Sequence, residues 1–339
     1  MNTLRRNMLR ILAAGVIGAA TVSANVSTAS AAGLTLPAKP ESGTLKMGIE
    51  PWLGYGPWQI AKEKDFFKKN GLDGVDIVNF TEDKDLNAAL ASGNIDAANV
   101  AAHTAMIMVA AGLPVKVVQM LDVSMTADAI IAGKGITSIK DLKGKQVAYE
   151  QGTTSDLLLN YALAANGMTI KDIQPVPMPA ANAGSALIAG RVPVAVTYEP
   201  YLTTAMNQNK DVKELFPASK DPGLISDVLV VRTDYIKSHP GQIAAMLKSW
   251  DDAVKAYRAD PKEGRAIISK SVGATPEELG TAFDGVKFYD LAENKKALGG
   301  DFVSKTYKDI EAAATKAGLL QQKVPASKVI DTDFVKAVK

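Results

Sequence analysis

Short apolar runs alternate with amphipathic stretches along the chain from residue 45 to residue 231. The runs at 45–50 and 75–80 have the length of buried strands, whereas residues 83–92 repeat apolar positions at helical spacing and stop at Gly93. Strands that alternate with helices across short joints are typical of βαβ units and a mainly parallel sheet. The pattern predicts strands at 45–50, 75–80, 95–100, 115–121, 146–149, 173–176, 194–197 and 227–231, and helices at 58–69, 83–92, 103–111, 155–165, 181–188 and 201–207.

The chain from Thr233 onward is predicted to be all-helical. Within it, Leu247, Trp250 and Val254 fall on one face of a helix, so Trp250 is expected to pack in the core. The predicted helices of this part are 233–238, 241–259, 261–271, 275–284 and 301–317.

Two crossing segments indicate a two-lobed α/β protein. The apolar stretch 127–132 leads into two glycines, and the strand at 227–231 crosses back. We therefore expect a first lobe at 32–128, a second lobe at 129–227, and a return to the first lobe with a helical tail at 228–339. Two lobes of this kind place ligand chemistry in the cleft at the carboxyl ends of their parallel strands.

The first 31 residues are predicted to be a secretory signal peptide. Arg5, Arg6 and Arg10 form a basic region, residues 11–20 are apolar, and Ala29 and Ala31 form an A-x-A cleavage site. The segment fits both the general secretory and the twin-arginine routes, so the route of export to the periplasm stays open. The chain has no cysteine, which excludes a lipid-anchored lipoprotein, disulfides and a thiolate nucleophile.

Removal of the leader changes the formal net charge from +2 to about −1, because the leader contains three arginines and no acids. Lysines and acids are interspersed along the remainder, as on an ordinary solvated surface. The basic balance of the whole chain is therefore no indication of nucleic-acid binding.

Acidic residues mark the ends of the predicted strands. Glu50, Glu150 and Glu199 each follow a strand, as does Asp122, and Asp227 opens the return strand. None of these ends carries lysine or arginine. Converging carboxylates repel one another unless a cation or several N–H groups compensate them, and planar guanidinium pairs with carboxylates two bonds at a time.

Aromatic residues accompany the first of these acids in the loop EPWLGYGPW. Trp52 and Tyr55 lie among glycines and prolines, and the sequence leaves ligand contact and packing equally open for both. Their faces would attract a cation by about 0.5–2 kcal/mol each. Trp58 begins a helix and is expected to pack in the core.

Two predicted helix N-termini point instead to an anion. Thr153 and Thr154 begin one helix and His103 and Thr104 another, and helix N-termini bind anions without a basic side chain. A zwitterion or a polar neutral ligand such as urea would satisfy both signals. The two histidines are too few for a histidine-rich metal centre, and no HExxH, GxSxG or P-loop motif is present. No metal, cofactor or catalytic residue is predicted.

From residue 45 to about residue 317 the chain resembles the nitrate/taurine/sulfonate family of periplasmic substrate-binding proteins of ABC transporters, which is related to thiamine-precursor binders. The resemblance is carried by the segments GIEPWLGYGPWQIAKEKDFF, NAALASGNIDAANVAAHTAM, AAGLPVKVV, SIKDLKGKQVAYEQGTTSDLLL and AGRVPVAVTYEPY. Pro193 departs from the family's usual aspartate, a structural position. The resemblance implies a type II periplasmic binding protein fold, no catalysis, and ligand contacts at 50–55, His103, Thr104, 150–154 and Glu199.

The implied function is the solute-binding component of an importer, working as a monomer with a membrane permease and its ATPase. EPWLGYGPW, AYEQGTTSD and TYEPY are similar to a subgroup associated with urea-carboxylase-type nitrogen metabolism, which implies guanidinium or a related nitrogen-rich cation as the ligand. The alternatives are an aliphatic sulfonate, taurine, nitrate or a urea-type ligand. A thiamine-pyrimidine-synthase-like enzyme is the alternative from another class, but it would need histidine and cysteine chemistry that the sequence does not offer.

Overall fold

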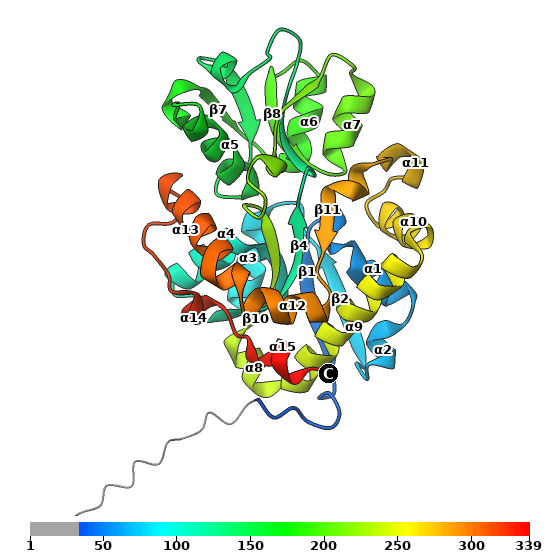
Figure 1. Ribbon diagram of the computed structural model, residues 1–339. Coiled ribbons are helices and arrows are strands. Elements are labelled where there is room, and N and C mark those ends of the chain that lie inside the picture. The colour runs from blue at the N-terminus through cyan, green and yellow to red at the C-terminus, as the bar shows by residue number, and fades with distance from the viewer. Residues whose placement is uncertain (1–33) are drawn as a thin grey trace, which may run out of the picture. The chain divides into compact units, whose positions relative to one another are not determined.

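The structure, a computed structural model, describes residues 34–339. The predicted signal peptide at 1–31 lies outside the described residues. Two β-sheets, each flanked by helices, form the two lobes of the described chain (Figure 1). We call the six-stranded sheet with its helices the first lobe and the five-stranded sheet with its helices the second lobe.

The first lobe is built on a mixed sheet with strand order β11-β4-β10-β3-β1-β2. Strand β1 pairs in parallel with β2 and β3, whereas β10 runs antiparallel to both β3 and β4. The edge strand β11 is also antiparallel to β4. The strands are β1 (Thr44–Ile49), β2 (Gly74–Asn79), β3 (Ala97–Ala101), β4 (Val115–Ser124), β10 (Ser226–Arg232) and β11 (Val286–Phe288).

The second lobe has strand order β7-β6-β8-β5-β9. Strand β6 is parallel to β7 and β8, and β5 is antiparallel to β8 and β9. Each sheet therefore contains a parallel group joined to antiparallel strands, and the expected mainly parallel arrangement is only partly correct. The strands are β5 (Asp128–Ala132), β6 (Gln146–Tyr149), β7 (Gln174–Pro177), β8 (Val194–Tyr198) and β9 (Lys213–Pro217).

The chain enters the second lobe between β4 and β5 and returns between β9 and β10 (Figure 1). The antiparallel strands β5 and β10 follow these two crossings, because a strand that arrives from the other lobe runs against the local βαβ direction. The lobe boundaries at residues 128 and 227 stay predictions, since sheet membership alone does not define a domain boundary.

The helices agree with the sequence pattern in position and differ in several ends. The predicted helix 58–69 is broken at Asp65, whose φ of 56° is left-handed, a conformation that aspartate tolerates better than most residues. The helices are α1 (Gly56–Glu63), α2 (Phe66–Lys69), α3 (Asp83–Ser92), α4 (Ala102–Ala110), α5 (Thr154–Ala165), α6 (Ala180–Ile188), α7 (Tyr201–Gln208), α8 (Thr233–Ser238), α9 (Pro240–Ala259), α10 (Pro261–Ser271), α11 (Pro276–Leu279), α12 (Leu291–Leu298), α13 (Tyr307–Lys316), α14 (Ala326–Val329) and α15 (Asp333–Ala337).

Short helical turns complete the described chain. The prediction of an all-helical part after Thr233 is wrong at β11, a three-residue strand too short to produce a strand pattern. The predicted helix 275–284 is two short helices, and 301–317 begins as a π-helix. The turns are 3-10 helices η1 (Leu53–Tyr55), η2 (Ile139–Leu142), η3 (Ile170–Asp172), η4 (Ala218–Lys220) and η5 (Ala282–Gly285), with the π-helix η6 at Phe302–Thr306.

Trp58 anchors the core of the first lobe. It has no exposed surface, and its ring centroid lies 4.7 Å from that of Trp250 on α9. Its indole N–H donates to Oδ1 of Asn99 at 2.8 Å, and Asn99 in turn donates to the carbonyl of Gly48 at 2.9 Å. The expectation that Trp58 and Trp250 are packing residues is confirmed. This anchor ties α1 to β1 and β3 and so fixes the start of the loop that follows β1.

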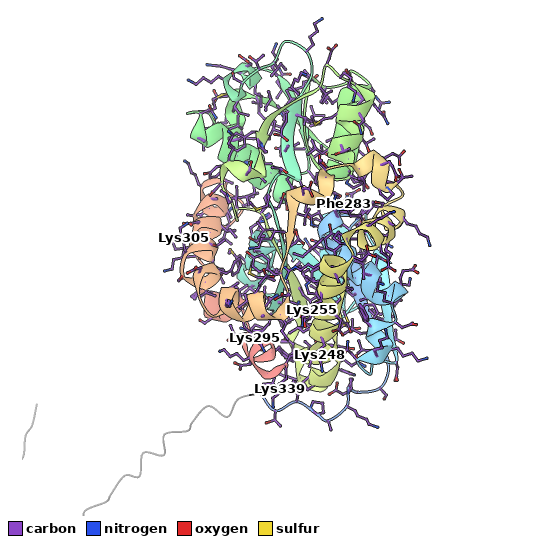
Figure 2. All side chains as sticks on the ribbon, turned by 45° about the vertical axis from the view of Figure 1, so that its right-hand side comes forward. Lys248, Lys255, Phe283, Lys295, Lys305 and Lys339 are labelled. Atoms are coloured by element: carbon purple, nitrogen blue, oxygen red, sulfur yellow. The ribbon has the colours of Figure 1, made fainter. Side chains whose placement is uncertain are left out.

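Charged side chains are spread over the outer helices. Figure 2 labels Lys248 and Lys255 of α9, Lys295 of α12 and Lys305 in separate places on the first lobe. Within residues 34–339, every helix is too short or too polar to cross a membrane.

Candidate functional site

A pocket lies between the two lobes, at the ends of their strands, and both lobes contribute to its walls. From the first lobe come the loop after β1, the start of α3 and strand β10; from the second come β5, the loop after β6 and the end of β8. The cavity has a volume of about 40 Å³. The lining residues are Glu50, Trp52, Tyr55, Asp83, Ala101, Asp128, Glu150, Thr153, Thr154, Ser155, Ala180, Tyr198, Ile225 and Asp227.

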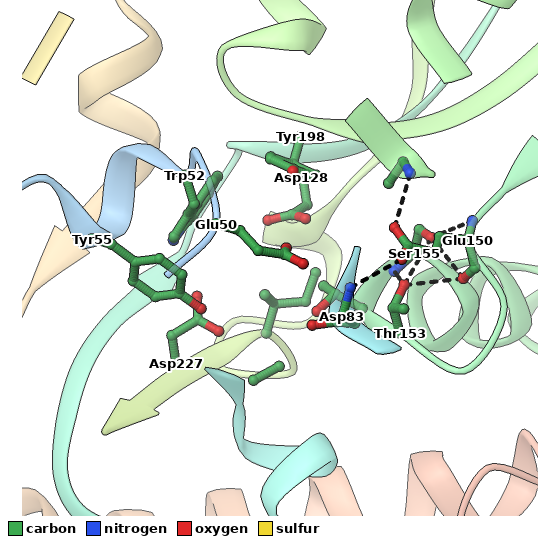
Figure 3. A pocket seen from close by; sticks show the side chains of 14 residues that line it. Glu50, Trp52, Tyr55, Asp83, Asp128, Glu150, Thr153, Ser155, Tyr198 and Asp227 are labelled. Carbon is green, nitrogen blue, oxygen red and sulfur yellow. Dashed lines mark hydrogen bonds between the residues drawn. The ribbon is translucent and has the colours of Figure 1, made fainter. Parts of the chain in front are cut away.

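Five carboxyl groups line this pocket, and lysine, arginine and histidine are absent from the lining. The carboxylates of Glu50 and Asp128 enter the same space from opposite lobes (Figure 3). Burial, followed by the charge of Glu150, raises the pKa of Asp83 to about 7, and burial raises the pKa of Asp128 to about 7. The pocket therefore favours a positive charge or protons near neutral pH.

Among the described residues that line the pocket, Glu50 carries the buried carboxylate oxygen that lacks a hydrogen-bond partner. Its Oε1 is buried and has no hydrogen-bond donor within the described chain. Burial, reinforced by Asp83, Glu150 and then Glu82, raises the pKa of Glu50 well above its ordinary value. A buried acceptor without a donor is costly, so this oxygen is the natural place for an N–H group of a ligand.

Glu150 connects the two lobes. One carboxylate oxygen accepts the backbone N–H of Asp83 at the start of α3 at 3.3 Å, and the other accepts that of Ala180 at the start of α6 at 3.0 Å. Helix α3 belongs to the first lobe and α6 to the second. The carboxylate thus caps one helix from each lobe, and helix N-termini stabilise negative charge.

The aromatic rings of Trp52, Tyr55 and Tyr198 form another wall of the pocket. The rings of Trp52 and Tyr198 meet edge to face across the two lobes with centroids 5.9 Å apart, and Tyr198 makes a similar contact with Tyr201 at 5.4 Å. The hydroxyl of Tyr55 is directed at the carboxyl of Asp227 (Figure 3). Beneath this wall, the indole N–H of Trp52 donates to Oδ1 of Asp122 at 3.2 Å.

Four backbone N–H groups at helix N-termini beside the pocket are already engaged. At the start of α5, the N–H of Gly152 donates to Asp156 at 2.9 Å, and that of Ser155 donates to the hydroxyl of Thr153 at 3.3 Å. Glu150 accepts the N–H groups at the starts of α3 and α6. An oxyanion that used these four N–H groups would have to displace their acceptors, two of which are carboxylates.

Seven of the eleven residues that the sequence predicts as ligand contacts line the pocket. Four lie outside the lining. His103 is buried, and its burial lowers its pKa to about 4. Thr104 is buried beside it on α4. Asp122 lies within β4, which continues to Ser124 rather than ending at Leu121, and its side chain faces Trp52. The seven are Glu50, Trp52, Tyr55, Glu150, Thr153, Thr154 and Asp227.

Glu199 turns away from the pocket. Its carboxylate accepts the backbone N–H of Thr203 at 3.0 Å and the hydroxyl of the same residue at 2.7 Å. Strand β8 continues to Tyr198, one residue beyond the predicted end. Because side chains alternate along a strand, this extra residue directs Tyr198 into the pocket in place of Glu199.

Three prominent lining residues were not predicted: Asp83, Asp128 and Tyr198. Asp83 begins α3, where an acid is ordinarily explained by the helix dipole. Asp128 is the one charged residue in the apolar stretch 127–132, and that contrast is a signal that could have identified it. Among the described residues, the His, Asp and Glu side chains form no group arranged to hold a metal ion.

Comparison with known proteins places these features in a family. The family profile described as NMT1/THI5 like matches residues 54–264. A protein of Brucella abortus, named only as a binding protein, is 27% identical over 267 residues, which cover 77% of this chain and 78% of that protein. A 4-amino-5-hydroxymethyl-2-methylpyrimidine phosphate synthase of Uromyces fabae is 26% identical over 236 residues, covering 63% of this chain and 66% of the synthase.

A solved structure has the same fold. The periplasmic aliphatic sulphonate binding protein SsuA of Escherichia coli superposes with a TM-score of 0.71 at 21% identity, covering 86% of this chain and 93% of that one. This likeness confirms the predicted type II periplasmic binding protein fold.

Proposed function

From the premise that the chain belongs to the NMT1/THI5-like family, we propose that it is the solute-binding component of an ABC importer. It acts in the periplasm after export, closes its two lobes on a small ligand, and delivers the ligand to a membrane permease that works with an ATPase. Relatives described as binding proteins, together with the two-lobed fold, support this role. Closure of two domains around a ligand is the hinge motion available to such an architecture.

We further propose that the ligand is a small nitrogen-rich cation, with guanidinium as the leading candidate. The observation that carries this proposal is a lining with five carboxyls and no basic side chain. Glu50 and Asp83 would accept N–H groups from the first lobe and Asp128 from the second, while Trp52 covers a flat face.

Binding assays with the full chain test the ligand. Guanidinium chloride at low millimolar concentration, well below its denaturing range, should raise the melting temperature, as should closely related amidines. Urea, nitrate, taurine and an alkanesulfonate form the comparison panel. Stabilisation by taurine or the sulfonate alone would overturn the cationic ligand and leave the importer role standing.

A variant pair tests the site itself. Glu50→Gln should weaken guanidinium binding about tenfold or more, because a hydrogen bond to a charged group contributes about 1.5–3 kcal/mol. Glu199→Gln removes another buried carboxylate, outside the lining, and should bind as the wild type does. Equal loss in both variants would assign the effect to the fold rather than to a contact.

Two alternatives retain specific support. An aliphatic sulfonate is favoured by the name of the structural neighbour and by Thr153, Thr154 and Ser155 in the lining. The other alternative is an enzyme like the fungal synthase, but the chain has no cysteine and the pocket lining no histidine. Detectable turnover of a pyrimidine precursor would support the enzyme.

A further inference from the structure

The carboxyl groups of Asp122 and Asp227 lie side by side at the edge of the pocket. The two residues are register partners on β4 and β10, and both are buried, Asp122 with 0% of its surface exposed. Oδ1 of Asp122 accepts the Trp52 indole N–H, while its Oδ2 has no donor anywhere in residues 34–339. Asp227 lies next to Asp122 because the two residues pair directly across β10 and β4. A proton shared between the two carboxyl groups would give Oδ2 of Asp122 a hydrogen-bond partner.

Within residues 34–339, no positive charge faces this pair. The charged groups that act on it are all acids, namely Asp128 on β5 and Asp83 on α3. The hydroxyl of Tyr55, in the loop after β1, also faces Asp227 and is the neutral titratable group beside it (Figure 3). On the neighbouring strands the partners are uncharged, with Ala101 opposite Asp227 on β3 and Phe288 opposite Asp122 on β11. Burial is the main cause that raises the pKa of both aspartates, and their mutual repulsion adds to it for Asp227. Two adjacent carboxyls of this kind titrate as a unit and hold one proton between them.

We infer that Asp122 is a positioning residue, which holds the indole of Trp52 against the pocket and shares with Asp227 a proton that leaves when a cation binds. The inference rests on the proposed cationic ligand. In the empty site the pair carries one proton and one negative charge. On binding, the O–H bond breaks, the proton passes to solvent, and the positive charge of the ligand beside Asp227 takes its place. Asp122 itself stays outside the lining and acts through Trp52 and Asp227.

Calorimetry counts the protons that guanidinium displaces from the pair and from the other protonated lining acids together, and Asp122→Asn isolates the share of the pair. Guanidinium chloride is titrated into the full chain at pH 7 in phosphate and in Tris, two buffers with different enthalpies of ionisation. The dependence of the observed heat on the buffer gives the number of protons released. We expect release by the wild type and a count lower by up to one proton in Asp122→Asn, because an amide donates to Asp227 permanently. That variant keeps an oxygen for the Trp52 indole, so a purely structural role would leave the count unchanged.

Glu199→Gln is the matched control, since it neutralises a buried carboxyl outside the lining whose charge acts on Asp128 and not on Asp122 or Asp227, and it should change the proton count less than Asp122→Asn does. If Asp122→Asn does not fold, infrared difference spectra decide, with the protonated-carboxyl band that is lost on adding guanidinium expected to be smaller in Asp227→Asn than in the wild type. An unchanged proton count in Asp122→Asn, or a lost band as large in Asp227→Asn as in the wild type, overturns proton exchange while guanidinium binding stands. Absence of any binding heat with guanidinium overturns both the inference and the cationic ligand.

Discussion

At the scale of single residues, Gly54 keeps open the space in which Trp52 meets Asp122. A Cβ atom at this position would lie 2.0 Å from Nε1 of Trp52 and 2.3 Å from Oδ2 of Asp122. Nε1 donates the hydrogen bond that orients the indole toward the pocket, and Oδ2 belongs to the carboxyl group whose Oδ1 accepts that bond. The glycine in the loop EPWLGYGPW is therefore a requirement of close approach and not only of turn geometry.

Gly54→Ala should consequently displace the indole and weaken ligand binding at least tenfold. Overpacking of this kind costs about 1–3 kcal/mol of stability, and thermal unfolding together with calorimetry would separate the two effects. Gly133→Ala is the control, because the nearest atom to its added Cβ is 3.8 Å away and its backbone is not left-handed. Wild-type affinity in Gly54→Ala would contradict the role given to the Trp52–Asp122 bond.

Tyr198 is the second residue whose role belongs to this scale. Its ring meets that of Trp52 from the other lobe, so Tyr198→Leu removes an edge-to-face contact formed across the pocket. Such contacts contribute about 0.5–1.5 kcal/mol, so calorimetry should give a dissociation constant about two to ten times larger than that of the wild type. Tyr161→Leu breaks a comparable pair with Phe216 inside the second lobe and should lower stability without changing affinity. If Tyr198→Leu lowered stability and left affinity unchanged, Tyr198 would be a core residue without a role in binding.

At the scale of elements, the sequence predicts strands well where they are apolar and less well where they end. Apolar residues identify β6 and β8, which contain no charge, and alternation identifies β1, whose exposed Lys46 lies between buried Leu45 and Met47. Strand β4 continues past its apolar run to Ser124 because β10 and β11 supply backbone partners there, and no local pattern contains that information. Neighbouring side chains of a strand point to opposite faces, so an error of one residue at a strand end changes which side chain faces the pocket. For this reason Tyr198 and not Glu199 lines the pocket.

Glu150 acts at the same scale, since it joins the N-termini of α3 and α6. Glu150→Gln replaces one acceptor oxygen by an amide donor that must face a backbone N–H. We expect about tenfold weaker ligand binding and a smaller ligand-induced compaction in small-angle scattering, because a charge-assisted bond across the lobes is lost.

Asp156→Asn provides the comparison for that variant. Asp156 accepts the N–H of Gly152 within the second lobe alone, so its loss should lower thermal stability and leave compaction intact. If Glu150→Gln closed and bound as the wild type does, its carboxylate would be a local helix cap without a bridging role.

At the scale of the whole molecule, the site depends on pairings between segments far apart in the chain. The alternation of strands and helices predicts two lobes, and the acids at strand ends predict a carboxylate-rich cleft. The register that sets Asp122 against Asp227, and the closeness of Asp83 to Glu150, arise only when the lobes are assembled. Asp83 was missed because an acid at the start of a helix already has a local explanation, and its closeness to Glu150 cannot be read from the sequence.

Assembly also makes the stability of the empty protein depend on pH. Asp83 and Asp128 have folded pKa values of about 7, raised mainly by burial above those of an unfolded chain. A carboxyl with a raised pKa contributes stability that is complete below its unfolded pKa and is lost as the pH rises through its folded pKa. The melting temperature of the empty protein should therefore fall between about pH 4 and pH 8, from the unfolded pKa of these acids to just above their folded pKa. Glu199, with a pKa also raised to about 7, adds a part of this fall that lies outside the pocket.

A cation in the pocket should oppose the part of the fall that comes from the lining acids. Ionised carboxylates bind it and protonated ones do not, so the rise in melting temperature caused by low millimolar guanidinium should be larger at pH 8 than at pH 6. In Asp128→Asn the fall without ligand should be shallower, while in Glu199→Gln the shift caused by guanidinium should keep most of its pH dependence, because Glu199 acts on one lining acid, Asp128. Thermal unfolding of the three proteins across this range measures both quantities. A guanidinium shift that grew toward low pH would mean that the ligand binds the protonated pocket, and the carboxylates would then not be the groups that hold its charge.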